Sequence, residues 1–239
     1  MNAPSLTHGM VLAAGLGLRM RPITETIPKP LVPVLGRSLL DRALDRFEAA
    51  GIATAVVNTH YLAAQVQAHV AGRTRPRIVI SHEAALLETG GGVALALRHL
   101  GLAPFAVANS DAIWIDGPVP ALRRLLGAWR DAAMDALLLL QPVERGVGYD
   151  GAGDFFVDAA GRLRRRGATP HAPYLFTGVQ ILHPRLFDGA PAGAFSLNVL
   201  YDRALARGRL FGLAHDGGWY HVGTPDGLRT VEALLRQIG

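Results

Sequence analysis

A glycine-rich segment near the start of the chain and a single lysine after it carry the residue types best suited to binding phosphate. Residues 12–22 read LAAGLGLRMRP, so an apolar run leads into Gly15, Gly17 and Arg19. Glycines let backbone N–H groups approach phosphate oxygens closely, and a guanidinium offers phosphate a planar pair of donors. Lys29 is the only lysine among the 24 Lys and Arg residues, which indicates a role that a guanidinium cannot fill. The pattern predicts a phosphate-binding loop.

This loop differs from the two common nucleotide-binding loops. It lacks the Gly-Lys-Ser/Thr of a P-loop. It also lacks the Gly-x-Gly-x-x-Gly and the acidic residue of a dinucleotide-binding fold, since Asn58 ends the second predicted strand. The structural alternative is a tight turn between a strand and a helix, with two basic residues at the surface.

A carboxylate follows another apolar run at the same predicted edge of the sheet. Residues 108–111 read ANSD and close a predicted strand over 104–109, so Asp111 is expected beside the glycine-rich loop. Proteins hold Mg²⁺ with one or two carboxylates together with phosphates and water. Asp111 is therefore a candidate metal ligand; alternatively, it caps the turn that follows.

The elements that must position these residues alternate along roughly the first 140 residues. Apolar runs predict strands, and apolar residues at helical spacing predict helices. The predicted strands are 10–14, 53–58, 78–80, 104–109, 135–141, 155–157, 162–164, 175–182, 210–213 and 219–222, and the predicted helices are 38–50, 61–71, 92–100, 119–129, 198–207 and one that opens at 224–225. Continuous apolar strands separated by helices predict an α/β fold with a Rossmann-like, mostly parallel sheet flanked by helices.

The alternation changes after residue 142, where strands and a hairpin predominate. We expect one domain over residues 8–239. Its first half, 8–142, carries the phosphate-binding loop, and its second half, 143–239, forms a small β-rich lid and returns to the main sheet. Residues 1–8 are expected to form a short frayed leader.

The composition excludes several classes of protein. Of the 239 residues, 50% are hydrophobic and 18% charged, which is enough apolar surface for a folded core. No apolar stretch approaches the roughly 20 residues of a membrane helix, and no signal peptide opens the chain, so we expect a cytoplasmic protein without membrane contact. Without cysteine there is no disulfide, thiolate metal site or cysteine nucleophile. The net charge of +5 fits a small anionic ligand, and no basic stripe with aromatics indicates nucleic acid.

Residues 12–22, together with PKPL at 28–31, resemble the signature of the nucleoside-diphosphate-sugar pyrophosphorylases, which are sugar-1-phosphate nucleotidylyltransferases. The similarity extends over roughly residues 8–238. Members that use UTP and N-acetylmuramate 1-phosphate in cell-wall recycling match best, at 88–92 (ETGGG), 177–178, 182–184, 193–195 and 219–224. The resemblance implies that an NTP and a sugar 1-phosphate give an NDP-sugar and pyrophosphate, on a fold of the nucleotide-diphospho-sugar transferase type.

The resemblance also assigns roles to individual residues. It implies that Arg19 and Lys29 are catalytic, and that Asp111 and His221 hold a metal ion, expected to be Mg²⁺. Relatives have Asp where this chain has His221, and an imidazole ligand makes Mn²⁺ an alternative. The implied nucleotide-binding residues are Leu12, Ala13, Ala14, Gly15, Gly17, Arg19, Ser81, Glu83, Leu86 and Asn109, and the implied sugar-binding residues are Glu88, Gly90, Gly178 and Asn198.

Three of the sugar-binding assignments have structural alternatives. Glu88 is also a carboxylate that the dipole of a helix N-terminus would favour. Gly178 is alternatively a strand bulge, and Asn198 a cap of the helix that follows it.

Other functions are compatible with the same residues. Within the family, the chain could be a mannose-1-phosphate guanylyltransferase or a glucose-1-phosphate thymidylyltransferase, although the Glu-Lys-Pro element of many thymidylyltransferases is absent between residues 161 and 176. A rival of another class is a non-catalytic nucleotide-sugar binding module whose metal site has decayed at His221. The expected partners are UTP and a sugar 1-phosphate, and the chain is expected to be a monomer or a weak homo-oligomer.

Overall fold

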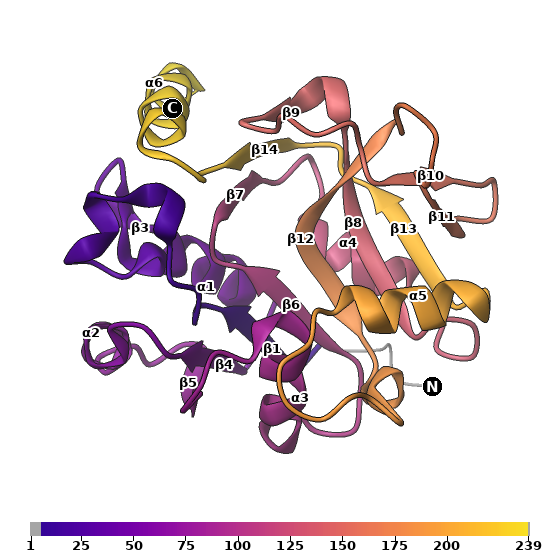
Figure 1. The fold of residues 1–239 in the computed structure, drawn as a ribbon, viewed down its shortest axis with the longest axis horizontal. Helices are drawn as coiled ribbons and strands as arrows, with labels where there is room; N and C mark the ends of the chain where they lie inside the picture. The colour runs from indigo at the N-terminus through magenta and orange to yellow at the C-terminus, as the bar shows by residue number, and fades with distance from the viewer. Residues whose placement is uncertain (1–5, 239) are drawn as a thin grey trace.

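The computed structural model describes residues 6–238 and is built around one twisted sheet (Figure 1). In the first half, four strands pair in parallel, with β1 between β4 and β6 and with β5 at the edge. Buried Val, Ala and Met residues fill β1, β4 and β6, whereas the edge strand β5 is mostly only half-buried. These strands are β1 (His8–Leu12), β4 (Thr54–Thr59), β5 (Arg77–His82) and β6 (Phe105–Asn109). Their carboxyl ends point to one edge of the sheet, where ligands bind in open α/β folds.

The second half extends this sheet by antiparallel pairing. Strand β12 (Tyr174–Leu182) runs antiparallel to both β6 and β8 (Ala136–Pro142), and therefore joins the two halves. Strand β13 (Leu210–Ala214) pairs in parallel with β8, and the hairpin of β10 (Phe155–Val157) and β11 (Leu163–Arg165) continues the sheet beyond β12. The predicted fold class, a mostly parallel sheet flanked by helices, is confirmed.

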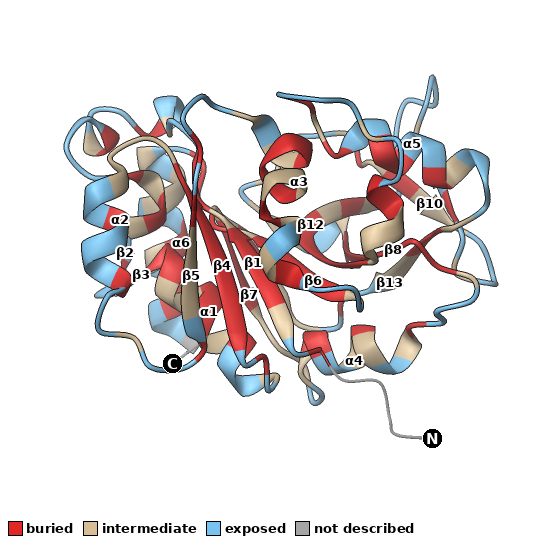
Figure 2. Ribbon diagram, turned by 90° about the horizontal axis from the view of Figure 1, so that it is seen from below, coloured by how far each residue is buried: buried red, intermediate tan, exposed pale blue. Residues whose placement is uncertain are grey.

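Helices cover both faces of the sheet, so the central strands are buried (Figure 2). One core contains residues of α1 (Leu39–Ala49), α2 (Ala63–Val70) and α4 (Ala121–Ala128), and the core on the opposite face contains residues of α3 (Glu88–Leu100) and α5 (Asn198–Ala206). Helix α1 begins where predicted because the backbone N–H of Asp41 donates to the hydroxyl of the N-cap Ser38 at 3.0 Å.

A second, small sheet follows the carboxyl end of β6. It consists of β7 (Ala112–Ile115), β14 (Gly218–His221) and β9 (Gly146–Val147), and the last helix, α6 (Pro225–Ile238), packs on it. A two-stranded ribbon, β2 (Pro33–Val34) and β3 (Arg37–Ser38), precedes α1. Neither β7 nor β9 was expected, because they are only four and two residues long.

Two predicted boundaries were wrong. The expected leader is ordered from residue 6 onward: Leu6 is buried in the core, β1 begins at His8, and residues 1–5 of the leader lie outside the described residues, as does residue 239. Helix α3 begins at Glu88, whereas the sequence predicted a start at Gly92. The three glycines after Thr89 are therefore inside the helix, where close neighbours replace the side chains that they lack.

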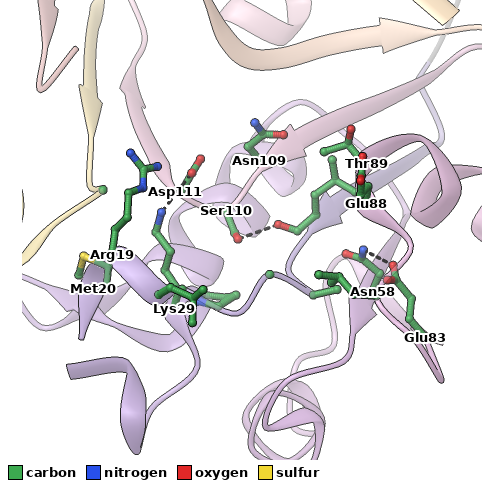
Figure 3. Close-up of a pocket in the computed structure, with 18 residues that line it drawn as sticks. Arg19, Met20, Lys29, Asn58, Glu83, Glu88, Thr89, Asn109, Ser110 and Asp111 are labelled. Carbon is green, nitrogen blue, oxygen red and sulfur yellow. Dashed lines mark hydrogen bonds and ion pairs between the residues drawn. The ribbon is translucent and has the colours of Figure 1, made fainter. Parts of the chain in front are cut away.

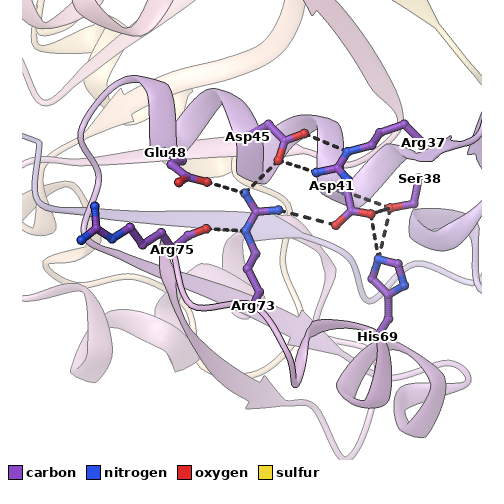
Figure 4. A network of polar contacts seen from close by, with 8 residues as sticks. All are labelled: Arg37, Ser38, Asp41, Asp45, Glu48, His69, Arg73 and Arg75. Atoms are coloured by element: carbon purple, nitrogen blue, oxygen red, sulfur yellow. Dashed lines mark hydrogen bonds and ion pairs between the residues drawn. The ribbon is translucent and has the colours of Figure 1, made fainter.

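A network of charges ties α1 to the turn between α2 and β5 (Figure 4). The guanidinium of Arg73 lies 2.8 Å from Asp45, 3.1 Å from Glu48 and 3.6 Å from Asp41. Its Nε also donates to the backbone carbonyl of Arg75 at 2.7 Å. Three carboxylates of α1 thus surround one largely buried cation, and these ion pairs connect α1 to the segment that precedes the edge strand β5.

The described part of the chain contains no helix that is both long enough and apolar enough to cross a membrane.

Candidate active site

The glycine-rich loop leaves the carboxyl end of β1 and folds back against Lys29. Gly17 has a φ of +64°, which an L side chain rarely adopts, and the hydroxyl of Thr24 donates to its carbonyl oxygen at 2.7 Å. A Cβ on Gly17 would also stand 3.0 Å from the Cβ of Lys29. The glycine therefore brings the loop and the lysine side by side, as phosphate binding by both requires.

A cleft of about 500 Å³ opens above this loop (Figure 3). Its walls come from β1, the loop after it, the segment before α3 and the end of β6. The cleft is lined by Leu12, Ala14, Gly15, Gly17, Leu18, Arg19, Met20, Lys29, Pro30, Asn58, Glu83, Leu86, Glu88, Thr89, Asn109, Ser110, Asp111 and Gly223. Its volume falls in the range of small-molecule sites.

Lys29 and Asp111 form an ion pair in the wall of the cleft. The Nζ atom of Lys29 lies 3.1 Å from Oδ2 of Asp111, and their side chains are 13% and 32% exposed. Burial alone would raise the pKa of the Asp111 carboxyl, but the polar contact with His221 and the charge of Lys29 outweigh it and hold that pKa well below its usual range. Asp111 is therefore a carboxylate across the physiological pH range.

His221 faces the same carboxylate from β14. Its Nε2 atom lies 3.6 Å from Oδ2 of Asp111, and its Nδ1 atom lies 3.2 Å from the carbonyl oxygen of Gly148. A carbonyl oxygen only accepts hydrogen bonds, so Nδ1 carries a proton, and Nε2 faces Asp111, where it either donates a second proton to the carboxylate or offers a lone pair to a metal ion. The ring stacks on Trp219, with 6.0 Å between centroids and 6° between planes, which fixes its orientation.

This pair fits a divalent cation. Two acceptors that face each other need a positive group between them, either a second proton on the ring or a metal ion. Residues 6–238 contain no group of three or more His, Cys, Asp or Glu side chains that could hold a metal ion. A metal bound here would therefore have two protein ligands, Asp111 and His221, as expected where phosphates and water complete the coordination.

Two buried polar residues position the loop, and the sequence prediction assigned a binding role to only one of them. The backbone N–H of Ala13 donates to Oδ1 of Asn58 at 2.6 Å, and Nδ2 of Asn58 donates to Oε1 of Glu83 at 2.7 Å. The backbone N–H of Leu87 donates to the other oxygen of Glu83 at 3.0 Å. Asn58 and Glu83 thus connect the start of the glycine-rich loop to the segment before α3. The only sequence indication was the unusual Asn58 at the end of a strand.

A short segment of the second half holds the start of α3. The carbonyl oxygen of Phe195 accepts from the N–H groups of Gly90 and Gly91 at 2.8 and 3.1 Å, and the N–H of Leu197 donates to the hydroxyl of Thr89 at 2.9 Å. We call residues 193–197 the strap. A Cβ on Gly90 would collide with the ring of Phe195, and a Cβ on Gly91 with the carbonyl oxygen of Gly193. These glycines serve the close approach of the strap.

The structure brings most of the predicted site residues together. Eleven of them line the cleft: Leu12, Ala14, Gly15, Gly17, Arg19, Lys29, Glu83, Leu86, Glu88, Asn109 and Asp111. His221 is outside this lining but contacts Asp111. The remaining five, Ala13, Ser81, Gly90, Gly178 and Asn198, are also outside it.

These five residues have identifiable surroundings. Ser81 is buried, and the amides of Ala13 and Gly90 are engaged by Asn58 and Phe195. Gly178, with a φ of +84°, lies against the side chain of Asn109, which lines the cleft. The side-chain oxygen of Asn198 accepts from Arg165 at 2.9 Å, at the first residue of α5.

The fold and the cleft define a nucleotidyltransferase. The model of the MobA-like NTP transferase domain matches residues 9–213, and the chain belongs to this family. The family prediction made from residues 12–31 is thereby confirmed.

Curated relatives extend this match over nearly the whole chain. The chain is 45% identical to an N-acetylmuramate alpha-1-phosphate uridylyltransferase of Caulobacter vibrioides, over 95% of this chain and 96% of the relative. It is 32% identical to a protein of the same name from Neisseria meningitidis serogroup B, over 94% and 96% of the two chains.

Solved structures agree on the fold. A UDP-glucose pyrophosphorylase complexed with UDP-glucose superposes with a TM-score of 0.78 at 17% identity, covering 98% of this chain and 100% of the other. HddC from Yersinia pseudotuberculosis, complexed with GMP-PN, gives a TM-score of 0.77 at 19% identity, covering 96% and 100%.

Proposed function

We propose that the chain transfers a uridylyl group from UTP to N-acetylmuramate 1-phosphate and releases pyrophosphate. The observation that carries the proposal is the convergence of the glycine-rich loop, Arg19 and the Lys29–Asp111 pair in one cleft. The choice of substrates is supported by the 45% identity with the uridylyltransferase of Caulobacter vibrioides over 95% of this chain.

The chemistry requires positioning and charge neutralisation. An oxygen of the sugar phosphate attacks the α-phosphorus of UTP, and the bond from that phosphorus to the oxygen bridging to the β-phosphorus breaks. Pyrophosphate leaves with the electron pair. The attacking phosphate is already ionised at neutral pH, so no side chain needs to remove a proton. We assign Arg19 to the leaving pyrophosphate, and Lys29 to the α-phosphate and the attacking phosphate.

We further propose Asp111 and His221 as the protein ligands of Mg²⁺ or Mn²⁺. When bound, the ion neutralises charge that develops on the phosphates during transfer. His221 presents a nitrogen donor, which Mn²⁺ accepts more readily than Mg²⁺ does. Gly148 and Trp219 orient that donor toward Asp111.

The test is a substrate matrix read as pyrophosphate release. ATP, CTP, GTP, UTP and dTTP are each combined with the 1-phosphates of N-acetylmuramate, N-acetylglucosamine, mannose and glucose. We expect the highest kcat/KM for UTP with N-acetylmuramate 1-phosphate. A maximum for GTP with mannose 1-phosphate, or for dTTP with glucose 1-phosphate, would replace the proposal with the corresponding activity. Nucleotide binding by calorimetry without turnover on any pair would indicate a binding module.

A control variant tests whether the activity arises in this cleft. Lys29→Ala should lower pyrophosphate release by ~10²-fold or more while leaving the circular dichroism spectrum unchanged, since Lys29 lies at the cleft wall. Activity of Lys29→Ala equal to that of the wild type would come from another site or from a contaminant.

A further inference from the structure

A second cavity, of about 560 Å³, lies between the hairpin of β10 and β11 and the turn that leads from α5 into β13. Its lining shares no residue with the cleft that contains Lys29 and Asp111. Figure 1 shows β10, β11 and β13 together on one side of the molecule, with α2 and β3 on the other. The proposed reaction therefore leaves this cavity without a role.

Two arginines that line the cavity have no anionic partner. Arg162 and Arg164 are exposed, and neither guanidinium makes an ion pair or a hydrogen bond with any residue in 6–238. The guanidinium of Arg164 lies over the ring of Phe156, 4.1 Å from its centroid, and that of Arg162 lies 5.8 Å from the centroid of the Phe211 ring. An aromatic ring covers one face of a guanidinium and leaves the N–H groups in its plane free. Both cations can therefore donate to a ligand.

The other arginines of the same basic run, residues 162–166, are already engaged. The Nε atom of Arg165 donates to the carboxylate of Asp202 at 2.8 Å. The guanidinium of Arg166 donates to the carbonyl oxygens of Gly153 and Thr169 at 3.1 and 2.9 Å. Neither arginine lines the cavity. The arginines of this run that lack a partner are thus the ones that line the cavity, which distinguishes it from an ordinary solvated turn.

Positive charge predominates around the cavity. The carboxylate in its lining, that of Asp158, accepts from the backbone N–H groups of Ala160 and Arg162 at 2.8 Å each, and so stabilises the hairpin turn. Arg130 adds a further cation, since its guanidinium lies 5.1 Å from the centroid of the Phe211 ring, near which Arg162 also lies. Cations that gather without a counter-ion favour the binding of an anion.

The rest of the cavity is apolar, and its walls are fixed. The apolar side chains that line it are Phe156, Val157, Leu163, Leu205 and Leu210. The N–H of Gly212 donates to the carbonyl oxygen of Gly161 at 2.9 Å, which joins the hairpin to β13. The contact between Arg165 and Asp202 joins the hairpin to α5. Both walls are therefore held in place before a ligand binds, so little ordering opposes binding.

We propose that this cavity binds a small organic phosphate, with the phosphate group against Arg162 and Arg164 and the uncharged part of the molecule on the apolar side chains. Two guanidinium groups match the charge of a phosphate dianion and offer it paired N–H donors. The volume is that of small-molecule sites, which favours a metabolite over a protein segment. Nucleotides and sugar phosphates share this chemistry, so the test includes one of each. The inference does not depend on the proposed function, because no residue of the cleft takes part.

Nuclear magnetic resonance of the isotope-labelled protein tests the proposal, because shifts of backbone amides locate a bound ligand. UMP, glucose 6-phosphate and inorganic phosphate are titrated separately. We expect UMP or glucose 6-phosphate to shift the amides of residues 156–164 and 205–210, with a lower Kd than inorganic phosphate. The organic phosphate with the lower Kd identifies the source of the ligand. Amides of the glycine-rich loop, residues 12–19, report binding in the cleft separately.

Variants then assign the binding to the two arginines. Replacing Arg162 and Arg164 by Met together should raise the Kd measured at the cavity amides by on the order of tenfold or more, from the loss of charge-assisted hydrogen bonds. Arg164→Lys keeps the charge without the paired donors and should give an intermediate Kd. Arg123→Met is the matched control, at an exposed arginine of α4 outside both cavities. Lys29→Ala should change only the titration of the cleft amides.

Several results would overturn the proposal. They are an absence of shifts at the cavity amides at millimolar concentrations of all three probes, a Kd for inorganic phosphate as low as for both organic phosphates, and a Kd that is unchanged in the double variant. A tetraglutamate peptide that binds the same amides more tightly than either organic phosphate would assign the cavity to an acidic protein segment instead. If the double variant does not fold, Arg164→Lys and the comparison of probes on the wild type decide.

Discussion

The Nζ atom of Lys29 and the Nε2 atom of His221 face the same carboxylate oxygen, Oδ2 of Asp111, at 3.1 and 3.6 Å. A metal ion bound between Asp111 and His221 would need that oxygen as a ligand. We therefore expect the ammonium and a metal ion to compete for it. We also expect metal binding to be favoured only when phosphates arrive, since they bring further oxygen ligands and give Lys29 another anion to contact.

Lys29→Met should have opposite effects on metal binding and on turnover. Without nucleotide, the variant should bind Mn²⁺ several-fold more tightly than the wild type, because the competing cation is gone. Turnover should fall by ~10²-fold or more, because a positioned charge is lost from the phosphates. Electron paramagnetic resonance of free Mn²⁺ measures the first effect. Arg21→Met, at an exposed cation nearby, controls for net charge, and equal Mn²⁺ affinity in all three proteins would contradict the competition.

Lys29→Arg should be nearly as damaging as Lys29→Ala. The side chain is only 13% exposed and its Cβ faces Gly17, so the longer, planar guanidinium cannot reach the same point. We expect a loss of ~10²-fold in kcat/KM for both variants. Turnover of Lys29→Arg close to that of the wild type would show that any cation suffices at this position.

Asp111→Asn should remove most turnover and leave the fold intact. The substitution keeps the shape of the side chain but removes the charge that pairs with Lys29 and that we propose holds the metal ion. A Mg²⁺ titration of activity in the wild type and the variant checks this, with circular dichroism as the control for folding. Identical titration curves would place the metal ion elsewhere.

His221→Asp should shift the metal preference toward Mg²⁺ and raise activity at low Mg²⁺. A carboxylate oxygen suits a hard cation better than an imidazole nitrogen does. The measurement is the ratio of the Mn²⁺-supported rate to the Mg²⁺-supported rate, which should be higher in the wild type. The same ratio in both proteins would mean that His221 does not bind the metal ion. Trp219→Phe serves as a comparison, because it changes the ring stacked on His221 without changing a ligand.

Arg73→Met should destabilise the fold at neutral pH and less so in acid. Hydrogen bonds from Arg37 and Arg73 outweigh the effect of burial and lower the pKa of Asp45. A lowered carboxyl pKa stabilises the fold above the unfolded-state value of about 3.9, and this contribution is lost as the pH falls through the folded-state pKa. We expect a loss of about 1–3 kcal/mol at pH 7, for a partly buried cation with several partners.

Urea unfolding at pH 7 and at pH 3.5 measures this difference. The gap between the wild type and Arg73→Met should narrow at the lower pH, because the carboxylates around the missing guanidinium take up protons. Arg75→Met is the matched control, since Arg75 contributes only its backbone carbonyl oxygen to the network. A gap that is the same at both pH values would show that the three carboxylates do not account for it.

The sequence was sufficient where local pattern determines structure. The apolar runs at 53–58 and 104–109 became β4 and β6 within one residue at each end, and the helix predicted over 38–50 became α1 within one residue at each end. The placement of the glycine-rich loop and Asp111 at one edge followed from strands that run in parallel, because their carboxyl ends must coincide.

The sequence pattern could not predict contacts between segments that are distant in the chain. Nothing near Phe195 indicates that its carbonyl oxygen receives two N–H groups more than 100 residues earlier in the chain, or that this contact explains the glycines of α3. The hydrogen bonds of Asn58 join three segments in the same way. Helix α3 was therefore predicted to begin at Gly92, since glycines favour helix ends when no close neighbour is considered.

The single lysine places in the cleft a reactive amine that no other side chain of the protein provides. Apart from the terminal amine, Lys29 provides the only primary amine in the protein. Amine-directed reagents such as activated esters or aldehydes followed by reduction would thus modify one side chain, 3.1 Å from Asp111. A label could be placed in the active site without mutating any other residue, and protection of this amine by a nucleotide would report occupancy directly. By the same logic, any acylation of a lysine side chain in the cell would modify the wall of this cleft.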